Sequence, residues 1–136
     1  MRINKTSTRS AEKIIFPELS YKIVGASFNI FNELGWGLPE KDYQKALKEE
    51  LDELGLSYKQ EAYIPLQYKA INIGRYFADF IVDDKILIEI KVVSKLGYAH
   101  VKQILTYLKA ANLKLGILIY FTKEGIKYRR ILNSQF

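Results

Sequence analysis

The sequence has 136 residues, 49% of them hydrophobic, with one histidine, no cysteine and a formal net charge of +6. This length fits one globular domain with its own core, and the positive charge favours a polyanionic partner. The composition excludes disulfides, zinc-thiolate sites, thiol catalysis and multi-histidine metal sites, and it argues against a serine-histidine triad.

The first fifteen residues are expected to form a flexible tail ahead of a single domain over residues 16–136. The initial segment MRINKTSTRS is basic but lacks the apolar stretch of a secretory signal. No later segment has an apolar run long enough to cross a bilayer. We therefore expect a soluble, cytoplasmic protein without a membrane partner.

Two amphipathic helices are predicted next, over residues 17–34 and 39–54, with the corner between them formed by two glycines around Trp36. The first helix is expected to be buried over about half its circumference, along a stripe that contains Tyr21, Val24, Phe28 and Phe31 and is widened by Ile23, Ile30 and Leu34. The corresponding stripe of the second helix contains Tyr43, Leu47, Leu51 and Leu54. Both helices should therefore pack against the rest of the domain along one side.

Glu40 lies on the inward stripe of the second helix, three residues before Tyr43. A glutamate in the first turn is stabilised by the helix dipole and needs no further role. Alternatively, Glu40 could be a third carboxylate that approaches an acidic site on the sheet. The sequence leaves both interpretations open.

Three strands are predicted between residues 56 and 93. Pro65 indicates a sheet edge or a bend in the first of them, and residues 70–74 are expected to form the turn that follows. Glu61 in the first strand is a further acidic candidate, although a solvated charge at a sheet edge is the preferred interpretation. The second and third strands, residues 75–82 and 85–93, form a hairpin with Asp83 and Asp84 in its turn.

This hairpin carries the charged residues that point to chemistry. Nearly ideal alternation over residues 85–93 places Glu89 and Lys91 on one face, and the short turn brings Asp79 close to Glu89. Burying two carboxylates is costly unless something compensates their charge. A divalent cation that bridges Asp79 and Glu89 would do so.

A helix over residues 98–112 and two more strands complete the chain. Gln103 and Tyr107 border the apolar stripe of this helix and could reach the acidic site, or they could be ordinary boundary residues. The strand over residues 115–121 is continuously apolar and should be buried. The last strand, residues 127–132, carries a basic face that either contacts phosphates or protects a sheet edge. Its basic residues are Lys127, Arg129 and Arg130.

The order of these features resembles the PD-(D/E)XK nuclease superfamily: Asp79, then Glu89-x-Lys91, then Gln103-x-x-x-Tyr107 on a helix. Residues 37–43, GLPEKDY, also match the signature of the GxxExxY family of small bacterial and archaeal proteins. The resemblance covers about residues 17–132. It implies a restriction-endonuclease-like α/β fold, in which helices flank a mixed sheet and the elements follow the order ααβββαββ.

The resemblance also implies roles for the charged residues. Asp79 and Glu89 would bind Mg²⁺ or Mn²⁺, and Lys91 would act as a general base or stabilise charge. Glu40 would add an acidic group from the helix as a third metal ligand, and Gln103 would be an auxiliary catalytic residue. The supporting residues would be Tyr43 and Tyr107.

The leading hypothesis is a metal-dependent nuclease that acts on DNA, with RNA as the alternative substrate. A second hypothesis is an inactive nuclease-like fold that binds nucleic acid or protein, and a third is a structural ion network in an unrelated α+β domain. A homodimer would suit cleavage of both strands of a duplex.

Overall fold

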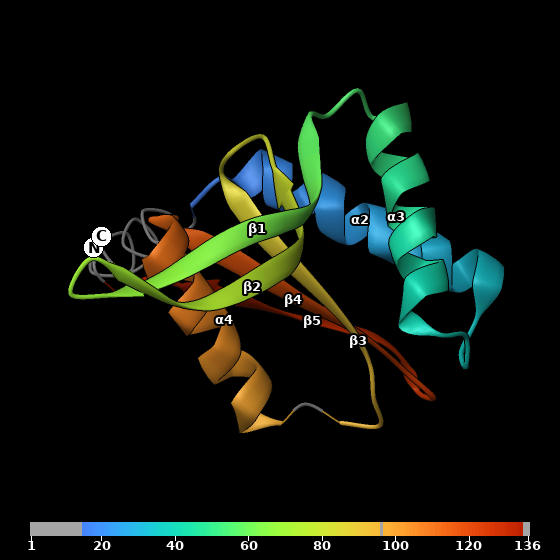
Figure 1. Cartoon of the computed structure of the whole chain (residues 1–136). Helices are drawn as coiled ribbons and strands as arrows, with labels where there is room; N and C mark the ends of the chain where they lie inside the picture. The colour runs from blue at the N-terminus through green and yellow to red at the C-terminus, as the bar shows by residue number, and fades with distance from the viewer. Residues whose placement is uncertain (1–14, 96, 135–136) are drawn as a thin grey trace, which may run out of the picture.

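The computed structural model describes residues 15–95 and 97–134, which form a five-stranded mixed sheet with helices on both faces (Figure 1). The elements are α2 (Pro17–Leu34), α3 (Glu40–Glu53), β1 (Tyr58–Tyr68), β2 (Ile71–Val82), β3 (Ile86–Val92), α4 (Tyr98–Ala111), β4 (Leu115–Thr122) and β5 (Gly125–Leu132). The predicted α/β class and the order ααβββαββ are confirmed. The tail predicted over residues 1–15 lies outside the described residues except for Ile15. No helix among the described residues is long and apolar enough to span a membrane.

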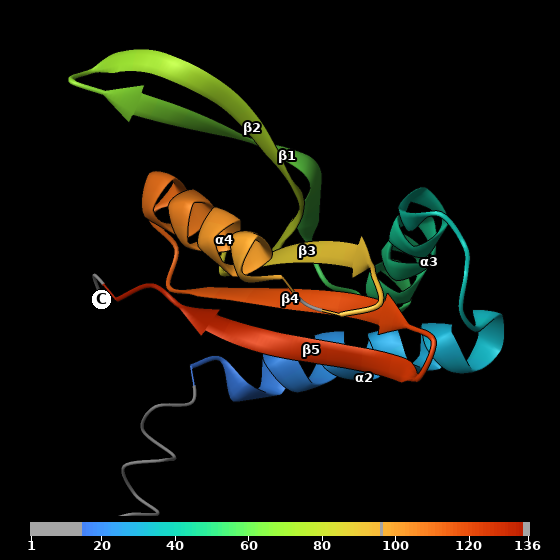
Figure 2. The same ribbon diagram turned by 90° about the horizontal axis from the view of Figure 1, so that it is seen from below.

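The sheet has the strand order β1-β2-β3-β4-β5. Neighbouring strands are antiparallel except β3 and β4, which are parallel and connected through α4. Figure 2 shows α2 below β4 and β5 and α4 above them, with the β1–β2 hairpin rising away from the sheet over α4. The central strands are therefore covered on both faces, which explains why β3 and β4 are almost continuously apolar.

Two hydrophobic clusters fill the spaces between sheet and helices. The first cluster joins α2 and α3 to one face of the sheet, and its members include Ile23, Ile30, Tyr43, Leu47, Phe80, Ile88 and Ile117. The second cluster joins α4 to the other face, and its members include Ala62, Ile64, Ala78, Leu87, Ile104 and Leu118. Alternate residues of β3 thus enter opposite clusters, as the period of two predicts.

The predicted buried stripe of α2 is confirmed at Ile23 and Ile30 but wrong at Tyr21, Phe28 and Leu34, which are exposed. Its buried side carries Ile23, Ala26 and Ile30, whereas Tyr21 is 80% exposed and Phe28 is 42% exposed. Apolar residues occur around most of this helix, so helical spacing alone does not define one face. The smaller side chains allow the helix to lie closer to the sheet, and the aromatic rings are left outside. Leu54, just beyond α3, is also exposed rather than buried.

The turns on either side of β2 both use left-handed backbone. The predicted turn at Asp83 and Asp84 is confirmed, with φ angles of 55° and 54°. The other turn is shorter than predicted, because β2 begins at Ile71 and pairs directly with Tyr68. Only Lys69 and Ala70 connect the strands, and both have positive φ, as a tight two-residue hairpin requires.

The signature GLPEKDY folds as the loop and first turn that place Glu40. The Tyr43 hydroxyl donates a hydrogen bond to the Gly35 carbonyl and accepts one from the Leu38 N–H. The Tyr43 ring is fully buried and stacks on Phe121, with ring centroids 3.9 Å apart. Tyr43 therefore anchors the loop before α3 to the sheet, and Glu40 begins the helix at a fixed position.

Candidate active site

The candidate active site lies at the fork where β2 separates from β3. The pairing between these strands runs from Val82–Ile86 to Phe80–Ile88 and then stops. Ala78 packs on the α4 side, whereas Phe80 packs on the α2 and α3 side. The strand therefore changes the face it presents at Asp79. The part of β2 that precedes Asp79 in the sequence is not paired with β3 and rises away from it together with β1 (Figure 2).

Asp79 and Glu89 bridge the fork with their side chains. The Asp79 N–H donates to Glu89 Oε2 at 2.9 Å, and the Ile90 N–H donates to Asp79 Oδ2 at 2.7 Å. These two N–H groups have lost their strand partners, so the carboxylates satisfy donors that would otherwise be unpaired. The arrangement brings the predicted pair together and holds both side chains from the backbone.

The two carboxylates lie in an environment that disfavours their charges. Burial, the charge of Asp79 and the charge of Glu40 raise the pKa of Glu89 to about 8, against the opposing effects of the Asp79 N–H and Lys91. The pKa of Asp79 is also raised, chiefly by burial and then by Glu40. Glu89 is only 5% exposed. The pair is therefore short of compensating positive charge.

Lys91 is the cation whose charge lowers the pKa of both carboxylates. Its ammonium lies 4.0 Å from Glu89 Oε1, at the limit of an ion pair, and the side chain is 21% exposed. Lys91 points to the same face as Glu89 because the two residues are separated by one position on β3. The ammonium thus lies beside the carboxylates while remaining accessible from solvent.

Helix α4 closes one side of the site with Tyr107. This residue is buried, and burial together with the charge of Glu89 raises the pKa of its hydroxyl. The Tyr107 ring lies 5.6 Å from that of Tyr76 on β2, measured between centroids. Gln103, one turn earlier, is exposed, and among the described residues its side chain makes no hydrogen bond with Asp79 or Glu89. Tyr107 is thus close to the site, whereas the role of Gln103 stays a prediction.

Helix α3 contributes from the other side of the fork. Glu40 is half-buried, and its charge raises the pKa of both Asp79 and Glu89. Gln44, one turn later, lowers the pKa of Asp79 through a side-chain hydrogen bond. However, no three acidic or histidine side chains in residues 15–95 and 97–134 converge closely enough to form a complete metal-binding group. Glu40 therefore acts on the pair from a distance.

Sequence reasoning missed Gln44 and Tyr76. Gln44 could have been found, because it follows Glu40 by four residues and so shares its side of α3. Tyr76 gives no such signal, since its contact with Tyr107 depends on how the hairpin passes over α4.

The predicted basic residues of β5 separate onto two faces. Lys127 pairs through Tyr120 with Lys91, and Arg129 pairs through Leu118 with Glu89. Cross-strand neighbours point to the same face, so Lys127 and Arg129 lie on the face of the acidic pair, about 10 Å away across two strand spacings. Arg130 lies on the opposite face and donates a hydrogen bond to the Ile15 carbonyl. Glu61 is exposed on edge strand β1, as the preferred interpretation predicted.

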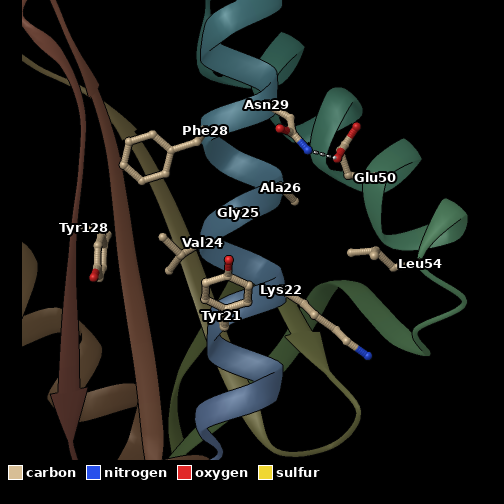
Figure 3. Close-up of a pocket in the computed structure, with 10 residues that line it drawn as sticks. All are labelled: Tyr21, Lys22, Val24, Gly25, Ala26, Phe28, Asn29, Glu50, Leu54 and Tyr128. Atoms are coloured by element: carbon tan, nitrogen blue, oxygen red, sulfur yellow. Dashed lines mark hydrogen bonds between the residues drawn. The ribbon is translucent and has the colours of Figure 1, made fainter.

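A groove of about 570 Å³ lies elsewhere, between α2, α3 and β5 (Figure 3). Its walls are largely apolar and include Tyr21, Phe28 and Tyr128. Asn29 Nδ2, which also lines the groove, donates a hydrogen bond to Glu50 Oε1 at 3.4 Å. Neither Asp79 nor Glu89 lines this groove. It has no paired titratable groups that could serve a reaction, so the fork remains the candidate active site.

A comparison with known protein families identifies the superfamily of this chain. The PD-(D/E)XK nuclease superfamily model matches residues 17–131. The chain belongs to this superfamily. No curated protein matches the sequence.

Solved structures similar to this PD-(D/E)XK chain agree on the fold. The crystal structure of SSO0001 is 24% identical, with a TM-score of 0.55, and the match covers 68% of this chain and 48% of that one. An alkaline exonuclease, LHK-Exo from Laribacter hongkongensis, is 18% identical with a TM-score of 0.51, over 68% of this chain and 54% of the exonuclease. The same exonuclease in complex with dAMP gives a TM-score of 0.52 at 18% identity, over 68% of this chain and 53% of the exonuclease. The matches therefore span only about half of these larger chains.

Proposed function

We propose that this protein is a metal-dependent nuclease that hydrolyses phosphodiester bonds in DNA, and that it is a member of the GxxExxY family within its superfamily. The observation that carries the proposal is the reciprocal bonding of Asp79 and Glu89 at the fork, with the Lys91 ammonium beside them. Superfamily membership supports the reaction class. The signature residues that fix the start of α3 support the family assignment.

The donor set at the fork fits Mg²⁺ or Mn²⁺. Asp79 and Glu89 offer hard carboxylate oxygens, which these ions prefer over the soft ligands that other metals require. Mg²⁺ is commonly held by one or two carboxylates together with water and substrate phosphates, so a complete three-residue group is not needed. The buried carboxylate of Glu89 and the half-buried carboxylate of Asp79, both with raised pKa values, are also the charge that a divalent cation would compensate. When bound, the ion supplies electrostatic stabilisation of the scissile phosphate.

The side chains around the pair have separate tasks in this proposal. Lys91 stabilises the negative charge that grows on the phosphate as the attacking water adds, because its ammonium lies beside the carboxylates and reaches solvent. Tyr107 excludes water from one side of the pair. Glu40, and beside it Gln44, adjusts the charge and orientation of Asp79 from α3. Gln103 is the predicted auxiliary residue. Its exposed amide lies on the same helix as Tyr107 and would contact the substrate once the substrate is bound.

The test is cleavage of single-stranded, duplex and branched DNA and RNA in the presence of Mg²⁺, Mn²⁺ or EDTA. We expect metal-dependent cleavage of DNA that falls at least about a hundredfold in Lys91→Ala. Lys22→Ala is the matched control, because Lys22 is exposed on α2 and should leave the rate unchanged. Equal cleavage by wild type and Lys91→Ala would refute the catalytic assignment.

Metal binding separates the nuclease from an inactive binding module. We expect Mg²⁺ to raise the melting temperature of the wild type and to leave that of Glu89→Gln unchanged. No stabilisation by Mg²⁺ and no cleavage would favour the binding module instead. The predicted homodimer and cytoplasmic location stay predictions, the first of which a solution mass measurement would check.

A further inference from the structure

The outward face of the β1–β2 hairpin carries an aromatic and cationic cluster that the acidic site does not use. Tyr63 and Phe77 are cross-strand partners with ring centroids 5.6 Å apart. The Arg75 guanidinium lies 5.6 Å from the Tyr63 ring centroid and 5.8 Å from that of Phe77. We call these three residues the arm cluster. Both rings remain about half exposed, at 46% and 48%.

The arm cluster lies on the side of the hairpin that α4 does not cover. Ala62 and Ala78 pack against α4, so the residues that alternate with them point outward. Phe77 precedes Asp79 by two residues, which places their Cα atoms about 7 Å apart along β2. The cluster therefore begins next to the fork and continues along the hairpin as it leaves the sheet (Figure 2).

The same combination of ring and cation recurs at the tip of the hairpin. The Lys69 ammonium lies 5.3 Å from the Tyr68 ring centroid, and Tyr68 is exposed. Between the arm cluster and the Tyr68–Lys69 pair, the exposed side chains of Ile71 and Ile73 continue the apolar surface. A contiguous exposed surface of this kind marks an interaction site more often than a free surface. Rings that served only to hold the two strands together would not need cations beside them at both ends.

Alternating aromatic rings and cations are the chemistry that recognises a nucleic acid strand with exposed bases. Bases stack on the rings, and the cations contact the phosphates between them. In a duplex the faces of the bases are already stacked on one another, so aromatic side chains on a flat hairpin have little to bind. The arm cluster therefore favours an unpaired strand over a duplex.

We propose that the arm cluster binds single-stranded nucleic acid and leads the strand to the Asp79–Glu89 fork. The proposal names the form of substrate for the nuclease proposed above and in that sense rests on it. Binding to the arm can nevertheless be measured without any cleavage.

The experiment measures the affinity for a fluorescein-labelled oligothymidylate by anisotropy in EDTA, where cleavage does not occur. The test variant is Tyr63→Leu combined with Phe77→Leu, because leucine keeps apolar contact between the strands but offers no aromatic face. The control is Tyr21→Leu combined with Phe28→Leu, which removes two exposed rings from α2 on the other side of the molecule. We expect the arm variant to bind at least about tenfold more weakly and the control to bind as the wild type does.

An abasic strand of the same length distinguishes stacking from charge. Wild type and arm variant should bind it equally, because it has no bases to stack. Arg75→Gln keeps both rings and removes one cation. It should therefore weaken binding of both the oligothymidylate and the abasic strand, and reduce the salt dependence of the affinity by about one released counterion. Thermal unfolding of each variant confirms that the hairpin still folds.

Three results would overturn the proposal. The first is equal binding of the oligothymidylate by wild type and arm variant. The second is an equal loss on the abasic strand, which would indicate a general effect on charge or folding. The third is a wild-type dimer that the arm substitutions dissociate while strand binding is retained, since the arm would then be a contact between protein copies. A wild type that binds the strand through the arm but never cleaves would instead refute the nuclease proposal alone.

Discussion

The substitution Glu89→Gln should make the metal-free protein more stable at alkaline pH. Glu89 is nearly buried, and burial beside Asp79 raises its pKa from 4.5 to about 8. Between these two pH values the unfolded chain releases the Glu89 proton, whereas the folded protein keeps it. The stabilisation that comes from holding this proton is complete below about pH 4.5 and is lost as the pH rises through 8. Glutamine has nearly the same shape and no charge, so the variant lacks the Glu89 contribution to this loss of stability.

The magnitude follows from the size of the pKa difference. Each pH unit between the two pKa values lowers the free energy of unfolding by about 1.4 kcal/mol. Over the full interval this amounts to about 3 to 5 kcal/mol, which is a large part of the stability of a small domain. Wild type and Glu89→Gln should therefore be similar near pH 5, and the variant should be the more stable protein by this amount at pH 8.5.

The assay is urea unfolding in EDTA at several pH values, followed by far-UV circular dichroism. The control is Glu33→Gln, which removes an exposed carboxylate from α2 and should follow the wild-type pH dependence. Adding Mg²⁺ at pH 8.5 should stabilise the wild type and leave Glu89→Gln unchanged. A difference between wild type and Glu89→Gln that stays constant with pH would refute the reasoning, because the carboxylate would then not be penalised by its surroundings.

Three further substitutions test other parts of the structure. Tyr43→Phe should lower the free energy of unfolding by about 1 to 2 kcal/mol in urea titrations, since it removes the hydroxyl that bonds the loop before α3; an unchanged midpoint would contradict this. Gly116→Ala should destabilise by about 1 to 3 kcal/mol, because a Cβ there would lie 2.7 Å from Ile104 Cγ2. Its check is the melting temperature, which should fall by several degrees. Ala70→Gly should raise the free energy of unfolding by about 1 kcal/mol, because alanine has a φ of 66° in the two-residue turn. A lower urea midpoint in this variant would show that the left-handed conformation is not strained.

Most of the fold could be predicted from local sequence patterns. The near-alternation in β3 and the apolar run in β4 define buried strands, and the glycines around Trp36 separate the two helices. The errors occurred where the pattern was ambiguous. Helix α2 carries apolar residues on several sides, and packing against the sheet, rather than spacing, decides that Tyr21 is exposed.

The centre of the candidate site was predictable for a related reason. A two-strand hairpin with a short turn fixes which residues lie opposite each other, so Asp79 and Glu89 could be paired from the sequence. Contributions from the helices could not be predicted in the same way, because they depend on tertiary packing. Gln44 is near Asp79 only because α3 lies beside the fork, and Tyr107 is buried only because the hairpin passes over α4.

The fork links the stability of the sheet to the chemistry proposed for it. Where β2 leaves β3, two backbone N–H groups lose their strand partners, and the side chains of Asp79 and Glu89 accept their hydrogen bonds. Alanine at either position would therefore remove a proposed metal ligand and leave a backbone donor unpaired, so lost activity in such a variant has two explanations. Asparagine and glutamine keep an acceptor oxygen and remove the charge. Activity lost in these amide variants, with the fold retained, would therefore be due to the charge, and Lys91→Ala leaves both hydrogen bonds of the fork in place.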